Sequence, residues 1–409
     1  MASLNYLTED FIVEILSWLP VNSLTRFKCL NKSLFSLIGQ HQFVTKQLHN
    51  HVRSANSENN LCNLLLDRIC SDTPNENFED ILSLLAYDEA SSRIGGDDFP
   101  FLVKTLNLPF YIDIDTRSLT IMDSCDGIVC LGCRSRIVIS NPGIREFKVL
   151  PKTCICFPPP VDSFDYYGCI AGLGYDPEAN DYKIVQLWDI FISFTRVIRV
   201  EVYTLSTDSW REIDNYALKV EINGLLMEVE IRGGIFNRSW NGAYYWYAQA
   251  IRVVPEARWS LKRRNAIVVF DMTYEIFQCI LMPESCEDQD DVPASNFSLL
   301  ELNGSLALFQ YPVLGEEKSF DIWAMEEFGV NGIWMKILSI GPLLGIEKPL
   351  LFVNSDFLLM EGKGVRLVSY NLKTKQVKRL PIYGKEDKFQ AIEYKQSLLA
   401  IHGGKRVDN

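Results

Sequence analysis

The chain has 409 residues, of which 47% are hydrophobic, 12% aromatic and 22% charged. This composition excludes a mainly disordered chain and a coiled-coil rod, and the length predicts two or three domains, or a small domain followed by a large β domain. Forty Lys and Arg against 52 Asp and Glu leave a net charge of −12. That balance argues against a nucleic-acid partner and favours a basic protein or a cationic surface.

The cysteines and the N-terminus indicate the compartment. Eleven cysteines occur at uneven spacing, which is a poor disulfide framework. Glu9 and Asp10 fall where a signal peptide would need apolar residues, and no apolar run approaches the roughly 18 residues of a membrane helix. We therefore expect a reducing, cytoplasmic environment and no membrane anchor.

The first 50 residues predict three short helices. Thr8 is a suitable N-cap, and an apolar stripe follows it until Pro20. A second helix begins after Ser23, and a third runs through residues 34–38. Because so short a segment cannot bury all of its apolar side chains, part of its surface should contact another protein. The alternative is that the helices simply dock on the downstream domain.

Residues 51–109 are expected to connect two domains. Residues 50–60 are polar and lack a period, which is typical of a linker. Residues 61–69 form a short apolar run, and residues 80–87 suggest a helical turn. The connector is therefore predicted to contain a short strand and a short helix.

From about residue 110 to 409 the pattern is β. Strand–turn–strand units are predicted at residues 137–151, 200–213, 266–280, 319–338 and 365–380. The later units recur every 50 residues, from Phe270 to Phe320 to Tyr370. Such a period is typical of a kelch-like β-propeller, with room for five or six blades. An irregular β-sandwich is the alternative.

Motifs for catalysis or metal binding are weak. The pair Cys130 and Cys133 lacks the partners of a zinc ribbon. The glycines of residues 172–177 and 361–366 do not have dinucleotide-loop or P-loop spacing and are expected to form tight turns. The four histidines lie in no recognisable triad. We therefore expect no catalytic residue, no metal and no cofactor.

Two clusters are candidates for protein contacts. The densest acidic run comprises Glu284, Glu287, Asp288, Asp290 and Asp291, which is either a solvated loop tip or a contact for a basic target. An aromatic cluster at Trp240 and residues 244–247 is expected to alternate across a strand. Most of these rings should pack between blades, with one or two available as interface anchors.

Residues 7–34, LTEDFIVEILSWLPVNSLTRFKCLNKSL, resemble the F-box, which joins substrate receptors to a Skp-type adaptor. The rest of the chain resembles the plant F-box-associated domain through segments 124–131, 141–151, 172–187, 203–213 and 333–350. The resemblance is greatest to S-locus F-box and S-locus F-box-like proteins. It implies an α+β multidomain chain, with a small three-helix F-box in residues 1–50 and a mainly β, propeller-like domain in residues 110–409.

The resemblance implies a non-catalytic substrate receptor of a Skp–cullin–F-box ubiquitin ligase. Its partners would be the adaptor, the cullin and RING subunits reached through it, and a basic target such as a non-self S-RNase in pollen. The implied adaptor-facing residues are Leu7, Phe11, Ile12, Ile15, Leu16, Leu19, Pro20, Leu24, Phe27 and Cys29, although the first helix could bury some of them. Alternatives are an F-box protein with another target, or a kelch-like oxidase or glycan-binding protein.

Overall fold

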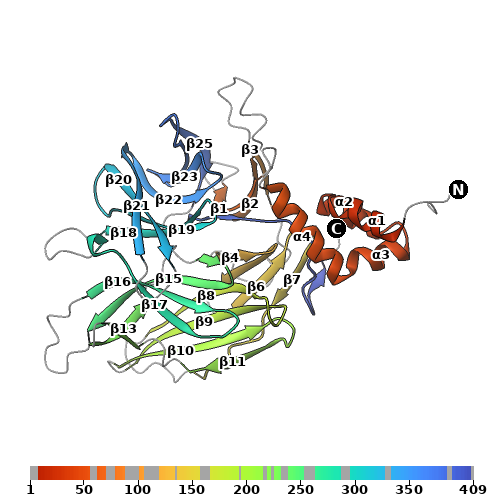
Figure 1. The fold of residues 1–409 in the computed structure, drawn as a ribbon, viewed down its shortest axis with the longest axis horizontal. Helices are drawn as coiled ribbons and strands as arrows, with labels where there is room; N and C mark the ends of the chain where they lie inside the picture. The colour runs from red at the N-terminus through yellow and green to blue at the C-terminus, as the bar shows by residue number, and fades with distance from the viewer. Residues whose placement is uncertain are drawn as a thin grey trace. The chain divides into compact units, whose positions relative to one another are not determined.

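The computed structural model describes residues 8–55, 62–70, 79–87, 101–105, 119–133, 136–156, 166–192, 195–214, 219–222, 225–231, 238–252, 263–286, 295–327, 333–384 and 389–406. Figure 1 shows the helices and strands along the chain. The chain divides into two compact units. One consists of Met1–Leu150 with Ala391–Asn409, and the other is Pro151–Gln390.

The N-terminal segment is helical, as the sequence predicts. The helices are α1 (Glu9–Ser17), α2 (Val21–Lys28), α3 (Lys32–Gly39) and α4 (His41–Ala55). Helix α3 begins with an N-cap, because the Asn31 side chain accepts a hydrogen bond of 2.8 Å from the Leu34 amide. Helix α4 was not predicted, and its last residues replace the start of the linker expected at 50–60. Within the described residues, no helix has the length and apolarity needed to cross a membrane.

The first unit contains two antiparallel sheets. One has the order β26-β1-β2-β3, and the other β27-β7-β6-β5-β4. The strands are β1 (Cys62–Cys70), β2 (Glu79–Tyr87), β3 (Phe101–Thr105), β4 (Leu119–Cys125), β5 (Ile128–Cys133), β6 (Arg136–Asn141), β7 (Glu146–Val149), β26 (Ala391–Glu393) and β27 (Lys405–Arg406).

The helical turn predicted at residues 80–87 is therefore wrong, because this segment is strand β2. It pairs along its whole length with β1, and its C-terminal half also pairs with β3. The segment expected to be a connector supplies three of the four strands of a sheet, and β26 supplies the fourth.

The second unit contains four antiparallel sheets. The first has the order β11-β10-β9-β8, from β8 (Tyr166–Asp176), β9 (Asp181–Ile192), β10 (Thr195–Thr204) and β11 (Ser209–Ile213). The second has the order β12-β13-β15-β16-β17, with β14 also paired to β15. Its strands are β12 (Lys219–Ile222), β13 (Leu225–Ile231), β14 (Arg238–Trp240), β15 (Ala243–Arg252), β16 (Arg263–Asp271) and β17 (Phe277–Leu281).

The other two sheets have four strands each and are ordered as in the sequence. One holds β18 (Ser295–Leu302), β19 (Ser305–Pro312), β20 (Glu317–Glu327) and β21 (Ile333–Leu344). The other holds β22 (Ile346–Phe352), β23 (Phe357–Gly362), β24 (Arg366–Asn371) and β25 (Val377–Tyr383).

All five predicted strand–turn–strand units are confirmed as antiparallel hairpins, namely β6–β7, β10–β11, β16–β17, β20–β21 and β24–β25. Three of them share one local cause. Asn141, Asp271 and Asn371 each begin a turn in which the side-chain oxygen accepts hydrogen bonds from amides two or three residues later. This repeated turn chemistry gives the sequence its recurring units.

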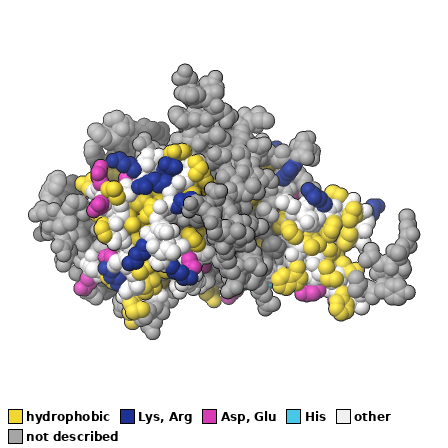
Figure 2. All heavy atoms as spheres, turned by 90° about the horizontal axis from the view of Figure 1, so that it is seen from above, with side chains coloured by type: hydrophobic (Ala, Val, Ile, Leu, Met, Phe, Trp, Pro, Cys, Tyr) yellow, Lys and Arg dark blue, Asp and Glu magenta, His cyan; other side chains and the backbone are white. Residues whose placement is uncertain are grey.

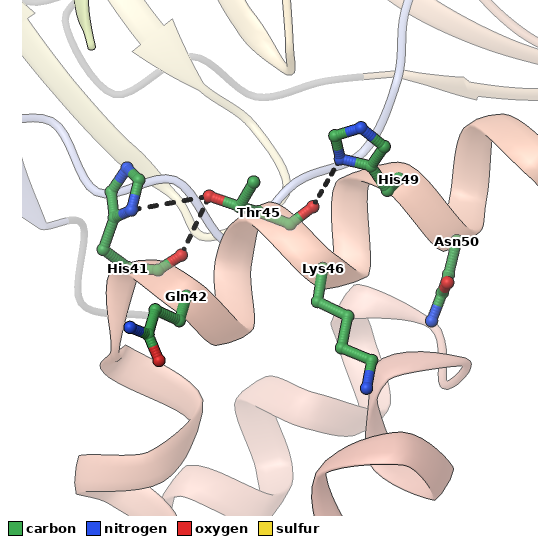
Figure 3. Close-up of a pocket in the computed structure, with 6 residues that line it drawn as sticks. All are labelled: His41, Gln42, Thr45, Lys46, His49 and Asn50. Carbon is green, nitrogen blue, oxygen red and sulfur yellow. Dashed lines mark hydrogen bonds between the residues drawn. The ribbon is translucent and has the colours of Figure 1, made fainter.

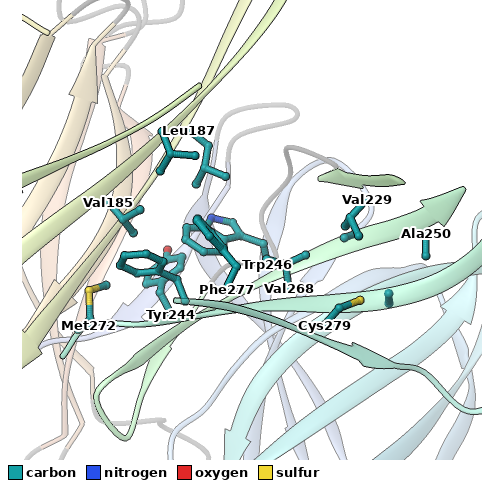
Figure 4. Close-up of a cluster of buried hydrophobic side chains, with 14 of the residues drawn as sticks. Val185, Leu187, Val229, Tyr244, Trp246, Ala250, Val268, Met272, Phe277 and Cys279 are labelled. Atoms are coloured by element: carbon teal, nitrogen blue, oxygen red, sulfur yellow. The ribbon is translucent and has the colours of Figure 1, made fainter. Parts of the chain in front are cut away.

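Three rings of the aromatic cluster, Tyr244, Tyr245 and Trp246, are buried on the two faces of β15, as Figure 4 shows for one face. Tyr244 and Trp246 lie in a core cluster with Leu187 from β9, whereas Tyr245 lies in another cluster with Phe297 from β18. The expectation of packing between sheets is thus confirmed. The same three rings are at most 1% exposed, so none of them can anchor an external partner.

One glycine of the motif at 172–177 is required by this packing. Gly172 lies within strand β8, and a Cβ there would lie 2.5 Å from the Tyr244 ring. Because Gly172 and Gly174 both belong to the strand, the turn expected within residues 172–177 begins only at Pro177. The turn expected within residues 361–366 is confirmed at residues 363–365.

A buried ion network joins β8, β9 and the β16–β17 turn. The Lys183 ammonium lies 2.6 Å from Asp176 Oδ2 and 2.9 Å from Glu275 Oε1, and it donates a 2.8 Å hydrogen bond to the Met272 carbonyl. Arg211 pairs with Glu275 from the exposed side. Two carboxylates thus share one buried cation.

Candidate functional site

The helical segment has a small core of its own within the first unit. Helices α1 to α4 contribute apolar side chains, and the β6–β7 turn and the C-terminal segment add two more. The buried members are Leu16, Val21, Leu24, Leu37, Ile38, Phe43, Val44, Ile144 and Leu398. Because Ile144 and Leu398 share this core, the helices are fixed against the adjoining sheet.

Other large apolar side chains of the helical segment remain exposed. Five of them, between 48% and 67% exposed, form what we call the helical apolar surface: Phe11, Ile15, Trp18, Leu30 and Phe35. Figure 2 shows hydrophobic side chains gathered on the helical segment, at the right of the view. Exposed apolar areas of this kind are typical of surfaces that contact another molecule.

Glu14 fixes the position of Trp18, one of the five exposed side chains. The Trp18 indole N–H donates a 3.0 Å hydrogen bond to Glu14 Oε1, and Lys46 of α4 lies 2.5 Å from Glu14 Oε2. The hydrogen bond from Lys46, followed by that from Trp18, lowers the pKa of Glu14 below its usual value. The carboxylate therefore orients the indole ring and links α1 to α4.

The structure divides the residues implied to face the adaptor. Phe11, Ile15, Pro20 and Cys29 are exposed. Ile12, Leu19 and Phe27 are half-buried, Leu16 and Leu24 are buried in the helical core, and Leu7 lies outside the described residues. The sequence allows the first helix to bury some of these residues, and Leu16 is one that it buries.

Three exposed residues were missed by the sequence reasoning. Trp18 follows the last residue of α1, Leu30 lies two residues beyond α2, and Phe35 lies within α3. Their signal in the sequence is that each is a large apolar residue in a segment too short to bury all of its apolar side chains.

A shallow depression of ≈ 520 Å³ runs along α4 (Figure 3). His41, Thr45 and His49 follow one another at four-residue spacing, and the Thr45 hydroxyl donates a 3.0 Å hydrogen bond to the His41 carbonyl. Toward α1, Asn50 Nδ2 donates a 2.7 Å hydrogen bond to the Ser17 hydroxyl. The Thr45 hydroxyl also lies 3.5 Å from His41 Nδ1, so these are local contacts between residues four apart on a helix surface.

The acidic run predicted to bind a target is only partly described. Glu284 is exposed, at the start of a short 3-10 turn, η3 (Glu284–Cys286). Glu287, Asp288, Asp290 and Asp291 lie outside the described residues. The role assigned to the run stays a prediction.

Two thiols of the second unit, Cys154 and Cys279, are poor nucleophiles. Burial raises the pKa of Cys279 to about 12. Burial, together with a hydrogen bond to Glu201, raises the pKa of Cys154 to about 11. Both thiols are thus protonated at neutral pH. Among the residues that the structure describes, no three metal-ligating side chains come together.

Comparison with known proteins identifies the family. Residues 102–401 match the family model described as "F-box associated beta propeller domain", which is well over half of the chain. The chain therefore belongs to this family, whose domain is a β-propeller.

Two similar proteins align with more of the chain than this domain. The chain is 22% identical over 399 residues to F-box protein CPR1 of Arabidopsis thaliana, which covers 91% of this chain and 84% of the relative. It is 24% identical over 380 residues to an F-box/kelch-repeat protein of the same plant, covering 91% and 89%. An alignment over 91% of the chain extends beyond the matched residues 102–401.

Among solved structures, a GH93 α-L-arabinofuranosidase of Fusarium graminearum is similar with a TM-score of 0.38 at 10% identity, covering 71% of this chain and 87% of that one. So distant a likeness carries no argument about activity. Proteins of the F-box family are in general non-catalytic receptors that bind Skp-type adaptors in ubiquitin ligases, and this chain is homologous to them.

Proposed function

We propose that this chain is the substrate-recognition subunit of a Skp–cullin–F-box ubiquitin ligase in the cytoplasm. The observation that carries the proposal is the helical apolar surface, whose five large side chains are exposed although the segment has a complete core. The propeller would hold the target, so that a conjugating enzyme elsewhere in the assembly meets target lysines at high effective concentration. In this role the chain positions the target protein and supplies no catalytic group.

The adaptor interface is tested by placing charge on the exposed surface. Phe11→Asp with Ile15→Asp should abolish co-purification with a plant Skp-type adaptor, because each apolar side chain buried at an interface contributes about 1.5–3 kcal/mol. Two such losses weaken binding by roughly a hundredfold or more. Leu16 is unsuitable for this test, since it is buried and a charge there would unfold the helices.

A matched control is available elsewhere on the chain. Tyr274 and Ile276 are 66% and 46% exposed in the β16–β17 turn. Tyr274→Asp with Ile276→Asp adds the same charge to equally exposed apolar residues and should leave adaptor binding unchanged. Equal adaptor binding by parent and by the Phe11 and Ile15 variant would contradict the proposal.

For the target, we infer a basic protein, and an S-RNase is the specific candidate. The net charge of −12 supports a cationic target, and the resemblance of the sequence to S-locus F-box proteins supports this particular class. The chain would then promote ubiquitination and proteasomal degradation of non-self S-RNases in pollen. A reconstituted ligase should ubiquitinate at least one member of an S-RNase panel. If it modifies none while adaptor binding is intact, the receptor acts on another target.

A further inference from the structure

The β24–β25 hairpin has a charge opposite to that of the whole chain. Residues 366–383 contain five cationic side chains and no carboxylate, although the chain as a whole carries −12. The cations are Arg366, Lys373, Lys375, Lys378 and Arg379. A cationic segment on an acidic protein can attract an anionic partner that the remaining surface repels.

Strand β25 presents one face of this hairpin to solvent. Val377, Arg379, Pro381 and Tyr383 are exposed, whereas Leu380 and Ile382 between them are buried. Val377 is 37% and Tyr383 49% exposed. The outward face therefore alternates apolar or aromatic side chains with a guanidinium, and it can take up a partner that has both anionic and apolar side chains.

Two cations of the hairpin have no carboxylate partner among the described residues. Lys375, in the turn, and Arg379, on the strand, belong to none of the ion pairs that the described residues form. Arg379 Nη2 instead donates a 3.3 Å hydrogen bond to the Leu344 carbonyl. Because Leu344 is 59% exposed, this contact adds another apolar side chain to the surface.

The backbone of β25 is open along the same edge. Strand β25 ends the order β22-β23-β24-β25, so no described strand pairs with its outer side. The Asn371 amide donates a hydrogen bond to the Gln376 carbonyl, so the peptide group of Gln376 faces β24. By antiparallel alternation the peptide groups of Val377 and Arg379 face outward. Pro381 limits the open edge to its first half.

We propose that this edge, formed by Lys375, Val377, Arg379 and Tyr383, binds an extended anionic peptide segment by strand addition. The segment's carboxylate or phosphoryl groups would meet Lys375 and Arg379, and its apolar side chains would pack on Val377 and Tyr383. Main-chain hydrogen bonds to residues 377 and 379 would fix its register. The proposal goes beyond the receptor role and is independent of adaptor binding.

Short labelled peptides test the proposal on the full chain. The probes alternate Val with Glu, with phosphoserine or with Lys, and binding is followed by fluorescence anisotropy at several salt concentrations. The Glu or the phosphoserine probe should bind, with affinity falling as salt rises, and the Lys probe should not. The two anionic probes distinguish carboxylate from phosphoryl recognition. Failure of both overturns the proposal and leaves the cations and Pro381 as protection against edge-to-edge aggregation.

Two variants of equal net charge separate local from global electrostatics. Lys375→Glu with Arg379→Glu should weaken the anionic probe by about tenfold or more. Lys152→Glu with Lys405→Glu also changes the net charge from −12 to −16, by reversing two exposed cations outside the hairpin, and should leave binding within about twofold. Equal losses in both variants overturn the proposed site. A probe with N-methylated backbone amides cannot donate main-chain hydrogen bonds to β25, so unchanged binding of that probe overturns strand addition.

Discussion

Removing the cation from the buried ion network should cost more stability than removing any surface ion pair. Lys183→Met leaves Asp176 and Glu275, whose side chains are 3% and 15% exposed, without their shared ammonium. Uncompensated charge of this kind costs about 3–5 kcal/mol. In a domain of this size that loss lowers the melting temperature by roughly 10 °C.

The pH dependence follows from the direction of each pKa shift. Burial alone would raise the pKa of Asp176, but hydrogen bonds from Lys183 and the Ala179 amide lower it below its usual 3.8. Its stabilisation is thus complete above that value and is lost as pH falls through the lower folded pKa. Burial alone would lower the pKa of Lys183, but hydrogen bonds to Asp176 and Glu275 raise it above 10.5. That stabilisation is complete below 10.5 and is lost as pH rises through the folded pKa.

Urea denaturation followed by tryptophan fluorescence measures the effect. The parent and Lys183→Met should differ by a constant amount between about pH 5 and pH 9, and the difference should shrink in stronger acid. Lys363→Met is the control, because its pair with Glu316 is 72% and 78% exposed and contributes about 0–1 kcal/mol. If the two variants lose equal stability at pH 7, the reasoning is refuted.

Three further predictions concern packing, hydrogen bonding and thiol reactivity. Gly172→Ala should lower the free energy of unfolding, measured by urea denaturation, by about 1–3 kcal/mol, because the added methyl group overlaps the Tyr244 ring; an unchanged free energy of unfolding would show that the ring can move. Asn141→Ala should cost about 1–3 kcal/mol by the same assay, since Asn141 Nδ2 donates to the Ser397 and Leu399 carbonyls at 3.2 and 2.8 Å. In the native protein at pH 8, iodoacetamide should alkylate exposed Cys29 well before buried Cys279, whose pKa is about 12. Peptide mass spectrometry measures the order of alkylation, and the reverse order would contradict this prediction.

The hairpins were predictable because their causes are local. A run of aromatic and β-branched residues, a turn that begins with Asn or Asp, and a second run suffice to define the three hairpins whose turns begin with Asn141, Asp271 and Asn371. The β24–β25 turn shows this, since Asn371 accepts from the amides of residues 373 and 374 and Lys375 adopts a positive φ of 58°.

Elements fixed by distant partners were not predictable in this way. Strand β2 has Leu at helical as well as alternating spacing, and only its pairing with β1 and β3 decides for the strand. The last turns of α4 are polar and carry no apolar stripe, so they suggested a linker. Tertiary contacts override local preference in both cases.

The candidate adaptor surface was predictable in position but not in detail. Helix α1 has the predicted apolar stripe, but the sequence does not show which of its side chains pack in the core of the helical segment. Leu16 meets them, whereas the adjacent Ile15 does not. When the apolar stripe of a helix is wider than the face that packs on the core, it contains both buried and exposed apolar residues.

The pairing of β26 with β1 has a consequence for synthesis of the protein. The first sheet cannot be completed until Ala391–Glu393 has left the ribosome, although Cys62–Cys70 emerges early. Leu398, which completes the core beneath the helices, is made later still. A chain cut short by premature termination thus lacks the support for its helical segment, and we expect that only full-length molecules present a stable surface to a partner.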